Sequence, residues 1–280
     1  KFSFSRLCAD AGVLDDFIEP AESILTKAFS KLVAVDSRRW IKFLTDILPR
    51  FSCELAASLS DFEKRMLQMF YITVFQEAAD WRSHTTQANM QLLADSPIMM
   101  HELNELLSFN LERIDFIDQP VPLGFDCPLD LHCTYTRDQI LIAMDYMTPK
   151  NVREGVKWLP DKQVDVFFIT LNKADKDYSP TTMYNDYSIN ESLFHWQSQS
   201  TTSDTASTGQ RYINHRQRGS KVVLFVREFK QDSIGAAPYT CLGTAAYVKH
   251  TGSKPMNITW HLDQPIPAKY LRKTNKLVVG

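Results

Sequence analysis

The 280-residue sequence has only five cysteines, and no two of them form a C-x-x-C pair: Cys8, Cys53, Cys127, Cys133 and Cys241. This spacing gives no support to a disulfide framework or a zinc finger, so we expect a reducing, cytoplasmic compartment. No apolar run approaches the roughly 20 residues of a membrane span, and the start lacks the charged-then-apolar layout of a signal peptide. We therefore expect no membrane segment.

Three widespread catalytic motifs are also missing. The sequence contains no GxxxxGK(S/T), no GxSxG and no HExxH, so it lacks the usual signatures of nucleotide hydrolases, acyl hydrolases and zinc proteases. The chain begins Lys1-Phe2-Ser3 without a Met, and we expect it to be a fragment of a longer protein. Catalysis can then reside in the missing part.

Charge is unevenly distributed along a chain of ordinary globular composition, with 44% hydrophobic and 23% charged residues. Residues 1–115 hold 12 Lys and Arg against 17 Asp and Glu, whereas residues 116–280 hold 19 against 16. Within the second half, residues 205–230 carry six Lys and Arg against Glu228 alone. Such a run creates a positive electrostatic field that would attract a phosphate backbone. The alternative interpretation is a basic surface that only faces solvent.

The first 115 residues have helical patterns throughout. Apolar residues recur at helical spacing after Pro20, after Asp36 and across residues 97–111. The clearest helix start is at Ser60, because Ser60 and Glu63 form a capping box that satisfies the exposed amides of a first turn. We expect one small helical bundle whose aromatic and methionine side chains form its core, and whose role is coupling or docking.

Prolines at positions 120, 122 and 128 interrupt the helical pattern and place a domain boundary near residue 117. We therefore expect a helical domain over residues 1–116 and a second domain over 117–280. The second domain begins with a short helix capped by Thr136 and Gln139. Five β-rich segments follow, at residues 164–171, 221–226, 239–242, 245–248 and 257–262. Few helices can alternate with them, so the expected fold class is α+β, with a mostly antiparallel curved β-barrel.

The sixteen residues from Tyr184 to Gln199 gather four large aromatic rings, a histidine and carboxamides. Aromatic faces can stack on a nucleobase and amides can read its edge, so this segment indicates a nucleic-acid reader. The candidate base-binding residues are Tyr184, Asp186, Tyr187, Phe194, His195, Trp196, Gln197, Ser198 and Gln199.

Two interpretations of this segment remain open. In a strand, Phe194 and Trp196 share one face, while His195 and Gln197 share the other, so only one set can contact a base. The alternative to a base site is that the aromatic rings fill the core of the barrel and His195 is structural. Tyr184 and Tyr187 can equally cap the barrel or stack on a base.

A hydroxyl-rich loop at residues 201–209 follows and leads into the arginine cluster. Its hydroxyls, amides and Gly209 suit close approach to phosphate, and a flexible solvent loop is the alternative. The candidate contacts to a DNA backbone are Ser207, Thr208, Arg211, His215, Arg216 and Arg218.

Several short motifs resemble one family in order and identity. These are Glu154–Val156, Thr170–Lys173, Tyr178–Tyr184, Phe194–Gln199, Thr208–Tyr212 and Leu224–Glu228. Together they resemble the C-terminal domain of SauUSI-like type IV restriction enzymes, in which this domain lies behind a phospholipase-D-type nuclease and a superfamily 2 helicase. The resemblance covers roughly residues 117–270, and the helical portion resembles the segment that couples helicase to reader.

The resemblance implies a reader of 5-methylcytosine in double-stranded DNA with a fold like the SRA and PUA group. Such a reader would turn the modified base out of the duplex into a fitted cavity, so this fragment would be a binding module and not an enzyme. It would need no cofactor or metal itself, whereas ATP and Mg²⁺ would serve the helicase and nuclease domains of the same polypeptide, in the bacterial cytoplasm. The oligomeric state is left open, including a homodimer.

Two other functions stay open. Pro160-Asp161 with Glu228-Phe229-Lys230 faintly resembles a metal-dependent nuclease centre. A second metal candidate, Asp126-Cys127 with His132-Cys133, lacks paired ligand spacing. The whole chain could instead be a docking or dimerisation module that holds a helicase without binding DNA.

Overall fold

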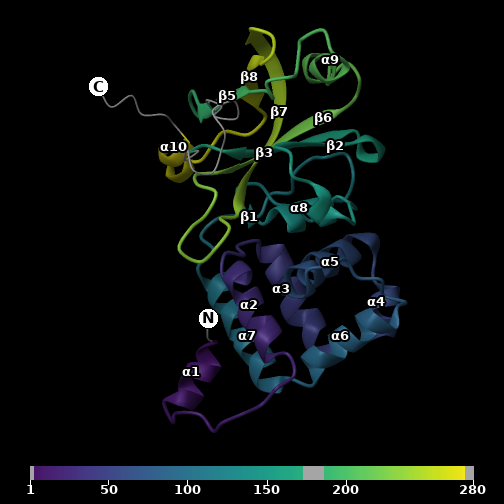
Figure 1. The fold of residues 1–280 in the computed structure, drawn as a ribbon, viewed down its shortest axis with the longest axis vertical. Coiled ribbons are helices and arrows are strands. Elements are labelled where there is room, and N and C mark those ends of the chain that lie inside the picture. The colour runs from purple at the N-terminus through teal and green to yellow at the C-terminus, as the bar shows by residue number, and fades with distance from the viewer. Residues whose placement is uncertain (1–2, 173–185, 275–280) are drawn as a thin grey trace. The chain divides into compact units, whose positions relative to one another are not determined.

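The computed structural model describes residues 3–172 and 186–274 (Figure 1). The chain divides into two compact units. The helical unit comprises Lys1–Pro120 and Asp126–Asn151, and the sheet unit comprises Val121–Phe125 and Val152–Gly280. Residues 126–151, which follow the expected boundary near residue 117, thus belong with the helices. None of the helices in the described ranges has the length and apolarity that crossing a lipid bilayer requires.

The helical unit begins where local capping signals predict. Ser60 with Glu63 caps one helix and Thr136 with Gln139 caps another, and both capping boxes have their two reciprocal hydrogen bonds. The elements are α1 (Phe4–Asp10), α2 (Glu22–Leu32), α3 (Arg38–Ile47), η1 (Leu48–Arg50), α4 (Cys53–Ser58), α5 (Asp61–Phe75), α6 (His84–Ala94), α7 (Pro97–Glu112), β1 (Thr134–Tyr135), α8 (Arg137–Ala143) and η2 (Pro149–Asn151).

Helix α5 is the centre of this unit, because every residue from Met66 to Val74 is buried. Two polar contacts fix its neighbours. The indole Nε1 of Trp40 in α3 donates to the carbonyl oxygen of Met66 at 3.0 Å. The Nε2 of Gln139 in α8 donates to the Oγ1 of Thr73 at 2.9 Å. Since buried polar groups must be paired, these contacts set the positions of α3 and α8 on α5.

Acidic side chains from the segment after α7 hold the first turn of α3. Asp118 accepts from the backbone N–H of Arg39 at 2.9 Å. Asp130 is fully buried, accepts from the Oγ of Ser37 at 2.7 Å and lies 2.7 Å from the Arg39 guanidinium. Negative charge is stabilised at a helix N-terminus. This anchoring explains why residues 126–151 pack with the helices.

The sheet unit contains seven strands and two helices among the residues that the structure describes. They are β2 (Val156–Leu159), β3 (Val164–Thr170), β4 (Tyr187–Ser188), β5 (Leu193–Gln197), α9 (Ser207–Ile213), β6 (Lys221–Arg227), β7 (Tyr239–Thr251), β8 (Asn257–Leu262) and α10 (Ala268–Thr274), with a 3-10 turn, η3 (Pro160–Lys162), between β2 and β3.

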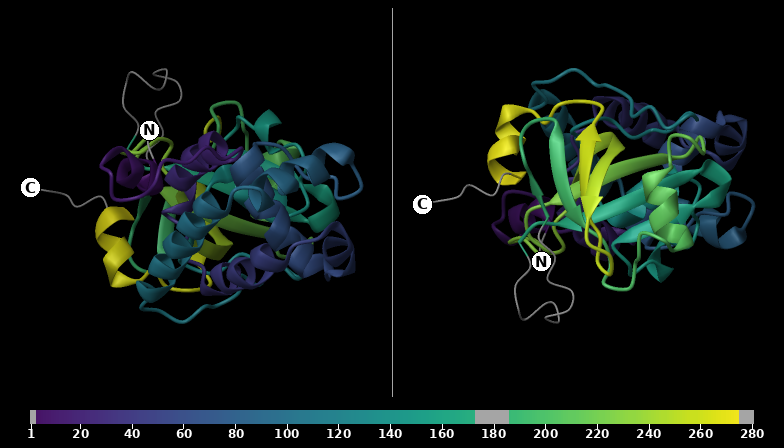
Figure 2. Two further views of the ribbon diagram at one scale, coloured as in Figure 1. Left: turned by 90° about the horizontal axis from the view of Figure 1, so that it is seen from below. Right: turned by 90° about the horizontal axis from the view of Figure 1, so that it is seen from above.

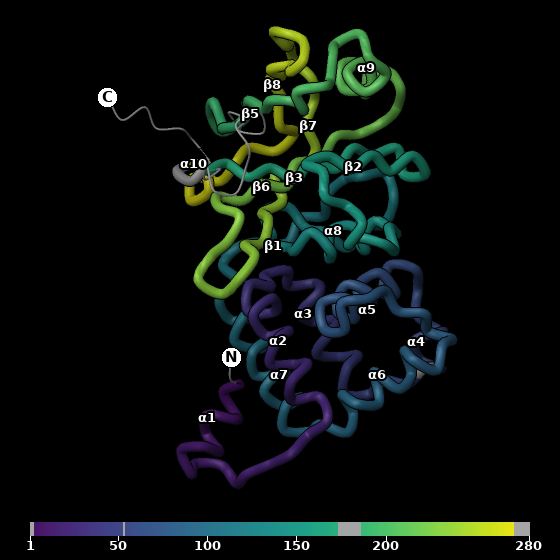
Figure 3. The backbone as a smooth tube through the Cα atoms, viewed as in Figure 1, coloured from purple at the N-terminus to yellow at the C-terminus, as the bar shows by residue number. Residues whose placement is uncertain are grey.

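The strand order β2-β3-β6-β7-β8-β5-β4 makes an open, mixed sheet, so the expected barrel was wrong, whereas the α+β class and the mostly antiparallel pairing are confirmed. All neighbouring pairs are antiparallel except β3 and β6, which are parallel. A parallel pair requires a long crossover, and here β4, β5 and α9 lie within it. The segments predicted as strands at 239–242 and 245–248 form one long strand, β7, which runs on into β8 through a hairpin (Figure 3).

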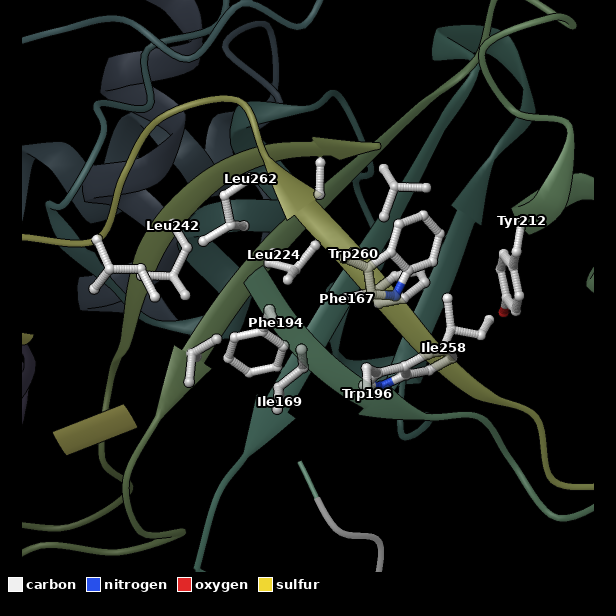
Figure 4. Packing of buried hydrophobic residues seen from close by; sticks show 14 of the residues in the cluster. Phe167, Ile169, Phe194, Trp196, Tyr212, Leu224, Leu242, Ile258, Trp260 and Leu262 are labelled. Atoms are coloured by element: carbon white, nitrogen blue, oxygen red, sulfur yellow. The ribbon is translucent and has the colours of Figure 1, made fainter. Parts of the chain in front are cut away.

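Aromatic rings form the core of the sheet unit (Figure 4). The Phe167 ring on β3 lies 4.4 Å from the Trp196 ring, 5.4 Å from Tyr212 and 5.6 Å from Trp260, measured between centroids. Trp196 comes from β5, Trp260 from β8 and Tyr212 from α9. One ring on β3 thus joins α9 to two strands on the other half of the sheet.

Gly209 lies in α9, buried against the loop that precedes the helix. A Cβ at this position would lie 2.0 Å from the carbonyl oxygen of Ser203. We expect Gly209→Ala to lower the free energy of unfolding by about 1–3 kcal/mol, the usual cost of overpacking. Urea denaturation followed by tryptophan fluorescence measures it. Gly155→Ala is the control, since its Cβ would lie 3.6 Å from the nearest atom; equal losses would contradict the steric explanation.

Candidate nucleic-acid interface

The alternation of side chains along β5 decides which candidate residues are accessible. Phe194 is 0% exposed and Trp196 is 5% exposed, and both point into the aromatic core (Figure 4). Neither ring can receive a base while this core is intact, which corrects their assignment to a base pocket. The interpretation that these two aromatics fill the core is confirmed, and His195 and Gln197 lie on the opposite, partly exposed face.

The strand register extends this opposite face over four strands. His195 pairs with Tyr187 on β4 and with Thr259 on β8, and Thr259 pairs with Lys249 on β7. In the next row, Gln197 pairs with Asn257 and Asn257 with Thr251. Directly paired residues lie on the same face of a sheet. We call this surface the platform, and its members are Tyr187, His195, Gln197, Lys249, Thr251, Asn257 and Thr259; β5 and β8 lie side by side in the view from above (Figure 2).

Two aromatic rings stack on each other at the β4 end of the platform. The rings of Tyr187 and His195 are 4.8 Å apart with an interplanar angle of 14°. Both residues are half-buried. Parallel aromatic surfaces of this kind are the usual support for a stacked base.

Carboxamides occupy the next row of the platform. The Nε2 of Gln197 donates to the Oδ1 of Asn257 at 3.1 Å, which fixes the orientation of both amides. The Oε1 of Gln197 is left without a hydrogen-bond donor among the described residues. Asp186 is buried and accepts from the backbone N–H of Gln197 at 2.9 Å, so its carboxylate ties β5 to the preceding segment. An amide oxygen is therefore the acceptor available to a ligand here.

The other three candidate base-binding residues have different positions. Ser198 is fully buried, and its Oγ accepts from the backbone N–H of Met256 at 2.9 Å, so its role is structural. Gln199 is exposed beyond the end of β5. Tyr184 lies outside the described residues.

Arg211 forms an internal ion pair, although it was a candidate phosphate contact. Its Nε and Nη2 donate to the two carboxylate oxygens of Asp165 at 2.7 and 2.8 Å, and the Asp165 side chain is fully buried. The guanidinium also packs over the Trp158 ring at 4.5 Å. Burial raises the pKa of Asp165, while the ion pair with Arg211 opposes that shift. This pair fastens α9 to β3.

His215 is also internal. It is 2% exposed, and its Nε2 accepts from the backbone N–H of Tyr247 at 3.2 Å. Its Nδ1 must then carry the proton and donate to the carbonyl oxygen of Ser220 at 3.2 Å. Burial lowers the pKa of His215, which favours this neutral form.

The remaining candidate backbone contacts are at the surface. Arg216 is exposed and pairs with Asp263 at 2.7 Å. Arg218 is exposed, and its side chain has no ion pair among the described residues. Ser207 is exposed and Thr208 is half-buried in the first turn of α9. Among the predicted contacts to a DNA backbone, these four residues are the ones that remain accessible.

The loop before α9 is fastened to the tip of the β7–β8 hairpin. The backbone N–H of Lys254 donates to the carbonyl oxygen of Thr202 at 3.1 Å, and the Oγ of Ser253 donates to the Oδ1 of Asp204 at 2.9 Å. Thr202 and Ser203 are buried. Gly209 is buried and packs against Ser203. The prediction that this glycine lies close to a phosphate was therefore wrong.

The β7 and β8 residues of the platform were not predicted from the sequence; they are Lys249, Thr251, Asn257 and Thr259. The signal for β8 was present, because polar Asn257, Thr259 and His261 alternate with apolar residues in a predicted strand. Lys249 had no such signal, since its face depends on a bulge in β7.

The suggested nuclease residues do not come together. Because β3 and β6 are parallel from Val164↔Lys221 to Thr170↔Arg227, Asp161 precedes one end of the pair and Glu228 follows the other. Seven residues at roughly 3.3 Å each separate those ends, so the two carboxylates cannot share a metal ion. Across residues 3–172 and 186–274, no three His, Cys, Asp or Glu side chains gather as metal ligands.

We expect Arg211→Ala to lower the free energy of unfolding by about 3–5 kcal/mol, because it leaves the buried Asp165 carboxylate without a counter-charge. Urea denaturation of the whole chain measures the loss. Combining Arg211→Ala with Asp165→Asn should recover part of it. Arg218→Ala is the control and should stay within about 0.5 kcal/mol of wild type. A loss for Arg211→Ala no larger than that of the control would show that the ion pair is not structural.

No curated protein matches the chain. The model of a family described as a domain of unknown function, DUF3427, matches residues 129–273, just over half of the 280 residues. This chain therefore belongs to the DUF3427 family.

Proposed function

We propose that the sheet unit is the recognition module of a modification-dependent, type IV restriction enzyme, and that it binds double-stranded DNA containing 5-methylcytosine. The motifs from Glu154 to Glu228 support the proposal through their resemblance to the recognition domain of SauUSI-like enzymes. The platform supports it independently, because stacked rings, an amide acceptor and an exposed lysine share one face. The platform is the observation on which the proposal depends.

In this proposal the platform would supply a stacking surface and an edge contact to an extruded cytosine. The base would stack on the Tyr187–His195 pair, and the Oε1 of Gln197 would accept from its exocyclic N4 amine. The 5-methyl group is next to N4 on the cytosine ring, so it would contact the same aromatic rings on which the base stacks. One buried methyl group contributes about 0.8 kcal/mol, so the expected discrimination against plain cytosine is modest, roughly fourfold.

The parent protein would combine this recognition module with further domains. The open sheet would be a variant of the SRA and PUA group, and the helical unit would couple the reader to a helicase. Binding and not turnover would be the work of this chain, with ATP and Mg²⁺ used by helicase and nuclease domains of the same polypeptide. The parent enzyme would act in the bacterial cytoplasm, as a monomer or a homodimer.

The direct test is a titration of the whole chain, without metal or nucleotide, into labelled duplexes that differ only in one cytosine methyl group. Fluorescence anisotropy should show binding to both, with a roughly fourfold preference for the methylated duplex. Equal affinity for both duplexes would refute methyl recognition. Absence of binding would support a docking module, and strand scission on adding Mg²⁺ would support a nuclease.

Substitutions at the stacked pair test the platform itself. Tyr187→Ala should weaken binding to the methylated duplex by about 1–3 kcal/mol, the usual contribution of one stacked ring. Tyr187→Phe is the matched control, because it keeps the ring and loses only the hydroxyl group, and it should retain most of the affinity. Wild-type affinity in Tyr187→Ala, with an unchanged melting temperature, would place the DNA elsewhere on the chain.

A further inference from the structure

We infer that Lys249 is the phosphate-binding residue of the platform, and that it holds the DNA strand beside the extruded base. The inference rests on the proposed function and adds to it a residue outside the arginine cluster. It follows from a bulge in β7, from the contacts that fix this bulge, and from the exposure of the Lys249 side chain in the same row as the stacked rings.

A bulge in β7 puts Lys249 on the platform. Tyr247 pairs with Trp260, and Lys249 pairs with the next residue of β8, Thr259, so Val248 is an extra residue. If β7 were regular at this point, strict alternation from Tyr247 would direct Val248 outward and Lys249 toward the aromatic core. Bulges of this type redirect side chains. Here the bulge brings Lys249 into one row with Thr259, His195 and Tyr187.

Contacts on the other side of the sheet hold the bulge in place. The backbone N–H of Tyr247 donates to the Nε2 of buried His215 at 3.2 Å. The Tyr247 hydroxyl lies 2.6 Å from the Nδ1 of His250, whose Nε2 lies 3.9 Å from Asp204. Residues on both sides of Val248 and Lys249 are therefore fixed to the inner side, and Lys249 projects from the outer side.

The charge of Lys249 is available to a ligand. Val248 and Lys249 are both exposed, and the Lys249 ammonium has no ion pair among the described residues. Within the interval 205–230, Arg218 is likewise exposed without an ion pair among the described residues, but two other basic residues have internal partners. Arg211 pairs with Asp165, and Lys221 donates to the carbonyl oxygen of Pro122 at 2.5 Å. Lys249 is thus an exposed cation in the same row as the stacked rings.

The spacing of the row suits one nucleotide. Lys249 and His195 are two strands apart, which is roughly 10 Å at the usual strand separation. The flexible four-carbon stem of Lys249 can shorten or lengthen this span, so a base stacked at Tyr187 and His195 can have its flanking phosphate at the ammonium. A lysine meets phosphate as a point charge and needs no fixed geometry.

The test measures anisotropy of the whole chain on the methylated duplex across a series of salt concentrations. Lys249→Ala should bind about fivefold more weakly, and the slope of log affinity against log salt should fall by about 0.9, the value for one lost phosphate contact. Lys249→Arg should keep both values near wild type. Lys254→Ala is the charge-matched control on the same hairpin, because Lys254 is exposed beyond the platform.

A neutral methylphosphonate beside the methylated cytosine tests the contact directly. It should weaken wild-type binding and have no further effect on Lys249→Ala, because both changes remove the same interaction. Additive losses, or equal losses for Lys249→Ala and Lys254→Ala, would overturn the inference while leaving DNA binding intact. If the wild-type chain binds no duplex, the proposed function fails first and the inference fails with it.

Discussion

The packing of Phe167, Phe194, Trp196, Ile258 and Trp260 into one buried core is the constraint on which the rest of the sheet unit depends. Side chains alternate along a strand, so a slip of one residue in β5 would expose two aromatic rings and bury His195 and Gln197. The free energy of that exchange is large compared with any contact on the outer face. The aromatic core thus fixes which polar side chains point outward and in what order.

The arginine cluster shows how a charge count differs from an electrostatic surface. Six basic residues in the interval 205–230 predicted a strong positive field. In the folded chain Arg211 is paired with buried Asp165, and Arg227 packs over the Tyr239 ring at 4.4 Å and donates to the carbonyl oxygen of Ala237. These side chains join elements of the sheet unit. Charged residues can be counted from a sequence, but only the fold shows which of them have internal partners.

Features set by neighbouring residues were predictable from the sequence, and features set by distant pairing were not. The capping boxes at Ser60 and Thr136, and the strands β3, β6 and β8, depend on local signals and were found close to their observed bounds. The parallel pairing of β3 with β6, the open sheet and the bulge at Val248 depend on long-range register. For the site, alternation correctly separated His195 and Gln197 from Phe194 and Trp196 but could not choose between the two sets.

The fastening of the Thr202–Asp204 loop to Ser253 and Lys254 has a consequence for the thermodynamics of association. A loop that must become ordered when a ligand arrives loses conformational entropy at that moment, and this loss weakens the complex. Here the hairpin and the loop already restrain each other in the free chain. A ligand that binds at this end of the sheet therefore causes little further loss of conformational entropy in the loop, because folding has already ordered it.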